Sequence, residues 1–144
     1  MHLATTEAAN DLLARDPLAL LIGMLLDQQI PMEKAFTSPE VLRERLGGEL
    51  AARTIASYDA DAFGQIFRQP PALHRFPAAM AKRVQDLARV LVERFDADAA
   101  GVWTGVADGP ELVDRIAHLP GFGAQKAKIF AALLGKQFDV RPPG

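Results

Sequence analysis

The sequence contains no cysteine among its 144 residues. It therefore cannot form a disulfide, and it cannot hold zinc or an iron–sulfur cluster through thiolates. The histidines are scattered too widely to form a metal-ligand pattern: His2, His74 and His118. We expect a protein without an iron–sulfur cluster, and its composition fits a reducing compartment such as the cytoplasm.

Long hydrophobic runs are also lacking. The longest run, Leu18 to Leu26, is too short to cross a bilayer, and the residues before it lack the basic start of a secretory signal. We therefore expect a cytoplasmic protein with no membrane partner. A chain of this length suits one domain, so residues 1–144 are predicted to form a single helical domain.

The sequence has no excess of basic residues: its formal net charge is -2. This balance argues mildly against a partner rich in phosphate. The charge is nevertheless uneven. From Leu119 onward the local charge is +3, so the preceding residues carry -5. The positive field is therefore concentrated in the last part of the chain, although a lysine-rich helix end is more often a solvated face.

Start and stop signals for helices follow one another along the chain, with little of the alternation that is typical of strands. The predicted fold class is therefore all-α. Asp16-Pro17 is a typical N-cap followed by a first-turn proline, and it predicts a helix from Leu18 to about Gln29 that Pro31 ends. This helix is apolar nearly all round, which places it at the centre of a bundle.

The rest of the chain carries similar signals. Ser38-Pro39 predicts a second helix start, with Gly47-Gly48 as its end. Apolar residues recur at helical spacing after Pro77, and Asp108-x-x-Glu111 has the pattern of a capping box. Gly135 is predicted to end the last helix. The predicted helices are Glu40–Leu46, Glu49–Ala56, Asp59–Arg68, Met80–Phe95, Leu112–His118 and Ala124–Leu134, and a loop is predicted at Asp96–Ala107.

The segment Leu119-Pro120-Gly121-Phe122-Gly123 lies between two predicted helices, in a helical hairpin at about 109–135. Two glycines separated by one apolar residue allow positive φ and leave the backbone uncovered. Such a turn presents consecutive N–H groups at the positive end of the following helix, which suits an anion such as a DNA phosphate. Lys126 and Lys128 add charge nearby. On spacing alone, an ordinary glycine turn between two antiparallel helices is an equal alternative.

This turn, with Ala127 four residues after its second glycine, resembles the helix-hairpin-helix signature of the base-excision DNA glycosylase superfamily of the endonuclease III type. The stretch from Asp16 to Gln29 is similar to the helix that opens the six-helix barrel of those enzymes and ends in a glutamine facing the DNA. Ala81 to Leu91 is similar to their mid-barrel helix. The resemblance implies a six-helix-barrel-type bundle that contains the hairpin, from about Asp16 to Gly135.

The resemblance also implies DNA as the partner and a set of contact residues, with nucleoid association if the source is bacterial. The carbonyls of Ala117, Leu119 and Phe122 would hold a monovalent cation beside the phosphate. The implied DNA-binding residues are Gln29, Gly121, Phe122, Gly123, Gln125, Lys126 and Lys128.

The chemistry that the resemblance implies is limited. Bifunctional members of the superfamily attack the sugar with a lysine at the position where this chain has Gln125, and an amide cannot form a Schiff base. The remaining possibility is monofunctional N-glycosidic cleavage assisted by a carboxylate. Asp139, in Phe138-Asp139-Val140-Arg141, faintly resembles the catalytic aspartate of the family, and it is our candidate for that role.

Three interpretations remain open. The first is a monofunctional DNA glycosylase, and the second is a DNA-binding module that keeps the hairpin without the chemistry. The third is a helical protein-interaction domain, which the net acidity permits. A glycosylase needs an enclosed pocket for a flipped base. We expect this chain to lack the complete second domain of the family, so that a partner chain or a further C-terminal segment would complete the cleft.

Overall fold

The computed structural model describes residues 3–143, which form eight α-helices, one 3-10 helix and no strand. The predicted all-α class is confirmed for this range. His2 and the extreme ends of the predicted domain lie outside it. The helices are α1 (Glu7–Arg15), α2 (Pro17–Leu26), α3 (Met32–Arg45), α4 (Ala52–Ser57), α5 (Ala60–Arg68), α6 (Pro77–Phe95), η1 (Ala99–Val102), α7 (Gly109–Ala117) and α8 (Ala124–Gln137).

Helix α2 forms the centre of the fold, as its composition predicts. Asp16 caps its first turn by accepting the Leu18 N–H at 3.0 Å, and Pro17 occupies the first helical position. Every residue from Leu18 to Leu26 is buried. The Phe36 ring of α3 packs directly against Gly23. A Cβ at position 23 would lie 2.5 Å from this ring, so the position has no room for a larger residue.

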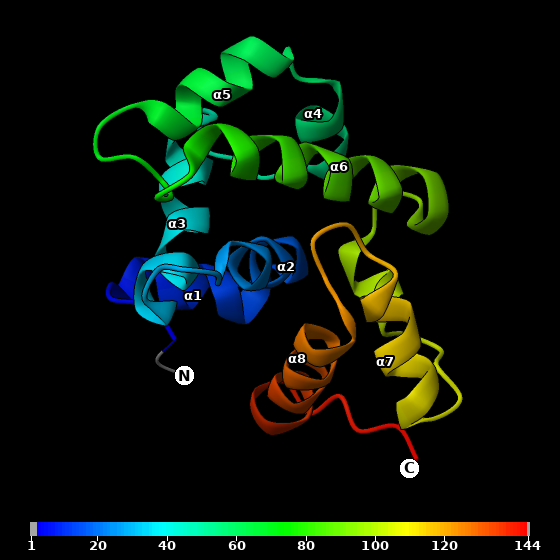
Figure 1. Ribbon diagram of the computed structural model, residues 1–144. Helices are drawn as coiled ribbons and strands as arrows, with labels where there is room; N and C mark the ends of the chain where they lie inside the picture. Colours follow the sequence, from blue (N-terminus) through cyan, green and yellow to red (C-terminus); the bar gives the residue numbers. More distant parts are fainter. Residues whose placement is uncertain (1–2, 144) are drawn as a thin grey trace.

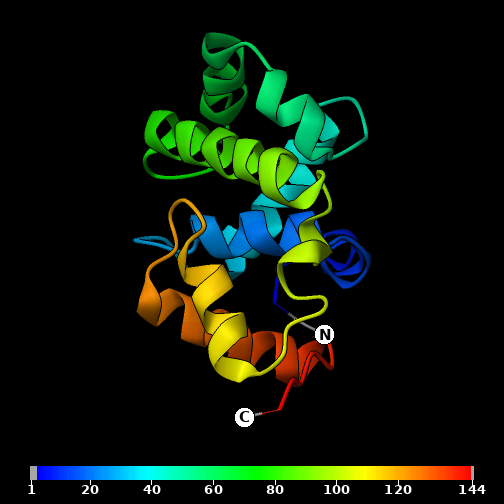
Figure 2. The ribbon, with the colours of Figure 1, turned by 90° about the vertical axis from the view of Figure 1, so that its right-hand side faces the viewer.

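The other helices are arranged around α2 in two groups (Figure 1). Helix α6 crosses the molecule, with α4 and α5 on one side of it and α2, α7 and α8 on the other. The helices α7 and α8 pack against each other as a hairpin. Figure 2 shows that the turn of this hairpin and the loop after α2 project on the same side of the molecule.

Several helix boundaries differ from those predicted, and two helical elements were not predicted. Helix α2 ends at Leu26, so Gln28 and Gln29 lie in a loop. Helix α8 continues past Gly135 to Gln137, since a single glycine without a left-handed backbone does not stop a helix that has core contacts on both sides. The 3-10 helix η1 lies inside the predicted loop. Helix α1, which was not predicted, begins after the N-cap Thr6.

The prediction that a helix starts after Ser38-Pro39 is wrong. Helix α3 begins at Met32 and contains Pro39 in its interior. The missing proline N–H removes one helical bond. The Ser38 hydroxyl lies 3.0 Å from the Lys34 carbonyl and 2.9 Å from the Leu73 carbonyl, so this part of the helix is also linked to the segment before α6. Burial of Ser38 and Pro39 against the rest of the fold keeps the helix intact.

At the ends of several helices, side chains from other elements donate hydrogen bonds to the last carbonyls, in place of a local glycine cap. Gln85 of α6 donates its amide to the Ile55 and Tyr58 carbonyls, at 3.1 and 2.9 Å, and so caps α4. Arg45 of α3 donates to the Ile66 carbonyl in the last turn of α5 and to the Gln69 and Pro71 carbonyls that follow this helix. These bonds satisfy carbonyl groups that the ends of helices leave unpaired.

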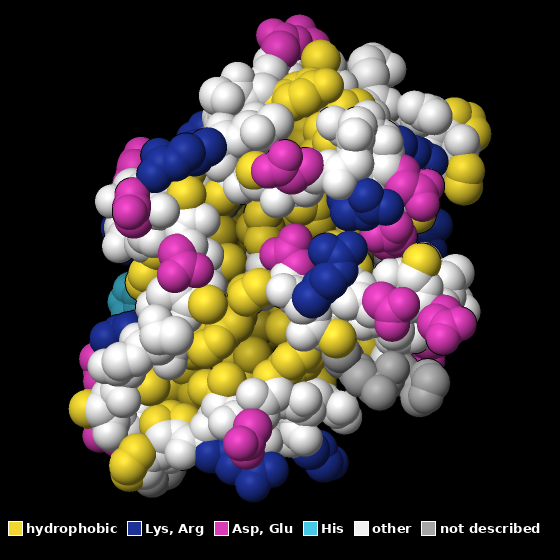
Figure 3. Space-filling model, turned by 180° about the vertical axis from the view of Figure 1, so that it is seen from behind, with side chains coloured by type: hydrophobic (Ala, Val, Ile, Leu, Met, Phe, Trp, Pro, Cys, Tyr) yellow, Lys and Arg dark blue, Asp and Glu magenta, His cyan; other side chains and the backbone are white. Residues whose placement is uncertain are grey.

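The face opposite to that of Figure 1 carries an apolar hollow surrounded by charges of both signs (Figure 3). Lys and Arg alternate there with Asp and Glu, so no basic patch forms on this face. Within residues 3–143, no helix has the length and apolar character needed to span a membrane.

Candidate nucleic-acid interface

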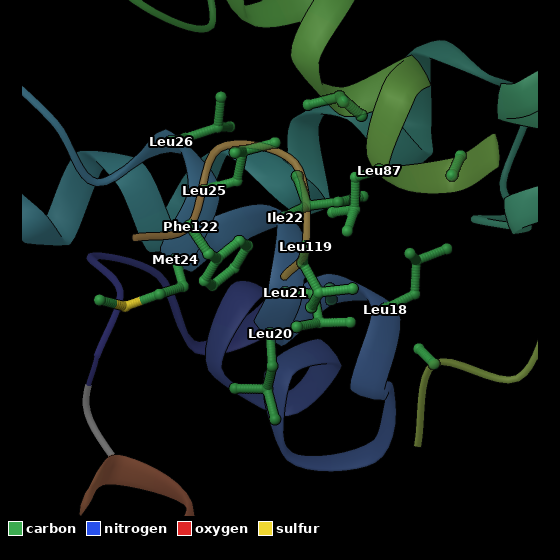
Figure 4. Packing of buried hydrophobic residues seen from close by; sticks show 14 of the residues in the cluster. Leu18, Leu20, Leu21, Ile22, Met24, Leu25, Leu26, Leu87, Leu119 and Phe122 are labelled. Carbon is green, nitrogen blue, oxygen red and sulfur yellow. The ribbon is translucent and has the colours of Figure 1, made fainter. Parts of the chain in front are cut away.

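The turn between α7 and α8, residues 119–123, is anchored in the core by its two apolar side chains. Phe122 is buried beside the α2 side chains Met24 and Leu25, and Leu119 is buried near Leu21 of the same helix (Figure 4). The Phe122 N–H donates to the Leu119 carbonyl at 3.1 Å and closes the turn. Gly121 and Gly123, by contrast, are exposed at the surface.

The two glycines of the turn differ in backbone conformation and in the space available for a side chain. Gly121 has a φ of +81°, and a Cβ on it would lie 2.0 Å from the Cδ1 atom of the fully buried Leu25. The fold itself therefore requires glycine at this position. Gly123 has a φ of -109°, and a Cβ on it would meet nothing within 4 Å. Nothing in the described fold requires glycine at position 123.

The N-terminus of α8 is open toward solvent. Its N-cap Gly123 provides no side-chain hydrogen bond, and its first turn contains no acidic residue. The first helical bond joins the Ala127 N–H to the Gly123 carbonyl, so the N–H groups before Ala127 have no acceptor within the helix. In α7, by contrast, Asp108 accepts the Glu111 N–H at 2.9 Å. The positive end of α8 can therefore accept an external anion.

The loop after α2 brings Gln29 to the surface beside this turn. Gln29 is exposed and has a φ of 60°, a left-handed conformation that is uncommon for a residue other than glycine. Gln28 points inward instead. Its Nε2 atom donates to the Leu25 carbonyl at 3.0 Å, and its Oε1 atom accepts from Arg83 at 2.8 Å. Only Gln29 of this pair presents an exposed side chain.

Two side chains from distant elements hold the end of α2. The buried His74 places its Nε2 atom 3.1 Å from the Leu26 carbonyl and 3.0 Å from the Gln28 carbonyl. Its Nδ1 atom accepts the Phe76 N–H at 2.9 Å, which assigns the proton of the neutral ring to Nε2. Lys126 donates to the Met24 carbonyl at 3.0 Å and the Leu25 carbonyl at 3.4 Å.

Burial shifts the pKa of three groups at this junction. It lowers the pKa of His74 below its ordinary value, although the hydrogen bonds to Gln28 and Leu26 act in the opposite direction. Burial also lowers the pKa of Lys126, and the neighbouring Asp27 carboxylate partly compensates. The pKa of Asp27 is raised by burial, against the pull of the Lys126 charge.

Phe76 is a further exposed residue on this side, and the sequence pattern did not point to it. Its ring is 41% exposed, and the Arg75 guanidinium lies 5.3 Å from the ring centroid. His74 joins Phe76 to the Gln29 loop through the bonds described above. The only available signal was an aromatic residue directly before a helix start, and this signal is too common to be informative.

The remaining predicted contact residues lie along α8. Gln125 and Lys128 are exposed, whereas Lys126 is partly buried because of its bonds to α2. An open groove of about 730 Å³ between α7 and α8 includes Lys128 and Ala131 in its lining, but not Gln29. Lys126 and Lys128 therefore face different surroundings: one faces the end of α2 and the other faces this groove.

Asp139 lies apart from the other predicted site residues. It follows the C-terminus of α8, whose 14 residues span about 21 Å from the hairpin turn. Its side chain is 87% exposed and lies 3.3 Å from Arg141. The structure therefore brings together Gln29, the turn and Lys126, but it leaves Asp139 at the opposite end of α8.

The carbonyl oxygens of Ala117, Leu119 and Phe122 could bind a monovalent cation only if they keep free lone pairs. Leu119 already accepts the Phe122 N–H, and it keeps a second lone pair. No hydrogen bond to the carbonyl oxygen of Ala117 or Phe122 is found among the described residues. The donor set of neutral oxygen atoms fits a hard cation. A trio or larger group of His, Asp and Glu residues that could hold a metal is not found in residues 3–143.

The fold and the turn together define an all-α protein with an exposed helical hairpin. Comparison with solved structures shows that this arrangement is similar to that of endonuclease III. The chain matches a trapped covalent intermediate of endonuclease III with DNA at 19% identity and a TM-score of 0.59, covering 82% of this chain and 47% of that chain. It matches a non-covalent endonuclease III–DNA complex at 18% identity and a TM-score of 0.61, covering 87% and 49%.

The chain thus spans about half the length of these endonuclease III structures. No protein-family model matches the sequence, and no curated protein matches it. The similarity predicted from the hairpin and from α2 is confirmed at the level of the fold, over most of the chain and at low sequence identity.

Proposed function

We propose that this protein binds DNA and that the hairpin turn is the primary contact for a phosphate. The observation that carries the proposal is Gly123. The fold leaves open space at its Cβ position and imposes no positive φ, so the missing side chain leaves room for a ligand against the N-terminus of α8. The similarity of the fold to endonuclease III in complexes with DNA supports DNA as the source of that phosphate.

Around this turn, Gln29 and Phe76 extend the contact surface, and the exposed Lys128 contributes charge. Backbone and lysine contacts to phosphates carry no sequence information, so binding is weakly selective for sequence and strongly dependent on salt. A monovalent cation held by the carbonyls of Ala117, Leu119 and Phe122 would offset the charge of the phosphate. The backbone N–H groups at the N-terminus of α8 would orient the phosphate.

We further propose that any base-excision chemistry is monofunctional N-glycosidic cleavage. Gln125 occupies the position of the lysine nucleophile and cannot form a Schiff base. The distance of Asp139 from the hairpin turn favours the second candidate function, a DNA-binding module without catalysis. In either case the residues from Asp16 to Gly135 correspond to a six-helix-barrel-type bundle, and a further segment or partner chain would close the pocket for a flipped base.

The experiment that tests DNA binding uses Gly123→Asp. An aspartate at the N-cap stabilises a helix, so the free energy of unfolding should stay unchanged or rise by about 0.5 kcal/mol. The same carboxylate repels a phosphate, so affinity for a short duplex should fall about tenfold or more. Fluorescence anisotropy at several salt concentrations measures the affinity, and chemical denaturation measures the stability. Opposite effects on stability and binding distinguish a ligand site from a structural turn.

Gly64→Asp is the matched control. Gly64 lies in α5, away from the turn, and a Cβ on it also meets nothing within 4 Å. Gly64→Asp adds the same charge as Gly123→Asp. It should leave the affinity for DNA within about twofold of wild type, because charges more than a Debye length away are screened. Lys128→Ala should flatten the dependence of log affinity on log salt by about one unit. The proposal is wrong if the folded wild type does not bind at low salt, or if Gly123→Asp binds as tightly as wild type.

A further inference from the structure

Three segments far apart in the sequence meet at the last turn of α2. They are the loop of residues 27–29, the segment of residues 74–76 before α6, and the first turn of α8. The carbonyls of this helix end accept from His74 and Lys126 rather than from a local glycine cap. The Met24, Leu25 and Leu26 carbonyls also accept local hydrogen bonds from Asp27 and Gln28, whereas the Gln28 carbonyl accepts from His74 alone. The two side chains therefore add bonds from distant segments to this helix end and supply the one partner of the Gln28 carbonyl that the described residues provide.

His74 fixes the loop and Phe76 relative to each other. One edge of its ring donates to the Gln28 carbonyl, directly before Gln29, and the other edge accepts the Phe76 N–H. The ring is only 1% exposed, so packing prevents it from rotating away. A single rigid group therefore connects the backbone of the two exposed residues, Gln29 and Phe76, that the proposed DNA surface uses.

Lys126 connects the same helix end to the hairpin. Its backbone lies three residues after Gly123, and its ammonium group binds the Met24 and Leu25 carbonyls. Leu25 also packs against Gly121, where an added Cβ would clash with the Leu25 side chain. The hairpin turn is therefore held against α2 both by packing and by a charged hydrogen bond.

We propose that His74 and Lys126 are positioning residues, which hold the Gln29 loop, Phe76 and the hairpin turn as one rigid surface for DNA. This inference rests on the proposed function and assigns these two side chains a role that does not require them to touch DNA. The left-handed backbone of Gln29 is uncommon for a residue other than glycine. Ordering this loop before binding removes an entropic cost that binding would otherwise carry.

The first test is a double-mutant cycle between His74 and Gln29, measured as affinity for a duplex with one abasic site. His74→Leu removes both polar edges of the ring and should weaken binding by about tenfold, the cost of ordering one or two residues. In a Gln29→Ala background the same change should weaken binding by less than about threefold, because the side chain being positioned is already absent. A purely structural role would weaken binding equally in both backgrounds, and this result would overturn the proposal.

Conservative variants separate hydrogen bonding from side-chain size. His74→Gln keeps a donor toward the Gln28 carbonyl, so it should bind DNA more tightly than His74→Leu. It also replaces His74→Leu in the test if that variant folds poorly. Lys126→Arg keeps a donor toward α2, whereas Lys126→Met does not, so arginine should retain more affinity than methionine. If Lys126→Met binds as tightly as wild type, Lys126 has no positioning role.

Gln85→Leu is the matched control for loss of a helix cap. It removes the two hydrogen bonds that end α4, away from the proposed DNA surface. It should lower stability to a similar degree and leave the affinity for DNA unchanged. A loss of affinity equal to that of His74→Leu would mean that the effect of His74 reports only overall stability.

A second measurement does not depend on DNA. Backbone ¹⁵N relaxation of the free protein should show the amide of Gln29 to be as rigid as the helices in wild type and mobile in His74→Leu. If wild type fails to bind DNA but the loop becomes mobile in the variant, the DNA function fails while the positioning contact is upheld. If the loop stays rigid in His74→Leu, the positioning proposal is wrong whatever the protein binds.

Discussion

The imidazole of His74 links the stability of the fold to pH. Its Nδ1 atom must stay unprotonated to accept the Phe76 N–H, and burial lowers its pKa below the ordinary value of 6.5. Lys34 and Arg83, the charged groups acting on the ring, are both positive and also disfavour the protonated form. The unfolded chain therefore binds a proton at a higher pH than the native protein does.

We predict that the stabilisation contributed by His74 is fully present above pH 6.5 and is lost as the pH falls from that value toward the lowered native pKa. The wild type should therefore lose more stability between pH 8 and pH 5 than His74→Gln, as measured by urea denaturation. His118→Gln, which changes an exposed histidine, serves as the comparison variant. Parallel slopes for wild type and His74→Gln would contradict the assignment of a neutral buried ring.

Single residues differed in how well the sequence predicted them. The glycine pattern predicted the exposed turn, because glycine carries its conformational meaning locally. His74 and Lys126 could not be predicted in the same way, since each acts on carbonyls that lie 46 to 102 positions away in the chain. The sequence presented Lys126 as an ordinary positive charge near the turn, and only its distance to α2 identifies a second role.

At the scale of elements, the contact between the hairpin turn and α2 depends on shape. Gly121→Ala would place a methyl group against Leu25 and impose a positive φ on alanine, so it should lower the free energy of unfolding by about 2–4 kcal/mol. Gly123→Ala should cost less than about 1 kcal/mol, the cost of a poorer N-cap residue. Chemical denaturation of the two variants checks this difference.

A double variant, Gly121→Ala with Leu25→Ala, tests the origin of the strain. The smaller residue at position 25 leaves space for the new methyl group, so the two changes should together cost less than the sum of their separate effects. Additive costs would place the strain in the backbone rather than in the contact.

Helices were predictable where a cap or an apolar period marked them, as in α2, α6 and the two helices of the hairpin. The start of α3 was missed because Ser38-Pro39 has the local form of an N-cap, while burial of that segment decides the outcome. Thr6 before α1 was a usable signal, since it caps the helix by accepting the Ala9 N–H. Local patterns thus indicate where helices exist more reliably than where they end.

At the scale of the whole molecule, the proposed chemistry predicts a negative result. With Gln125 in place of a lysine nucleophile, borohydride should trap no covalent adduct between the protein and abasic DNA. The assay compares wild type with Lys126→Met and Lys128→Ala by gel electrophoresis. A trapped adduct that disappears in either variant would show that a neighbouring lysine acts as the nucleophile.

The side chains that end α2, α4 and α5 also determine how the chain folds. These three helices contain 10, 6 and 9 residues, shorter than a helix that is stable alone in water. Besides local donors, their last carbonyls accept from side chains on α3, α6, α8 and the segment before α6. Helix formation in this region is therefore coupled to tertiary assembly, so isolated peptides of these segments would remain coil and the helices would form together in one cooperative step.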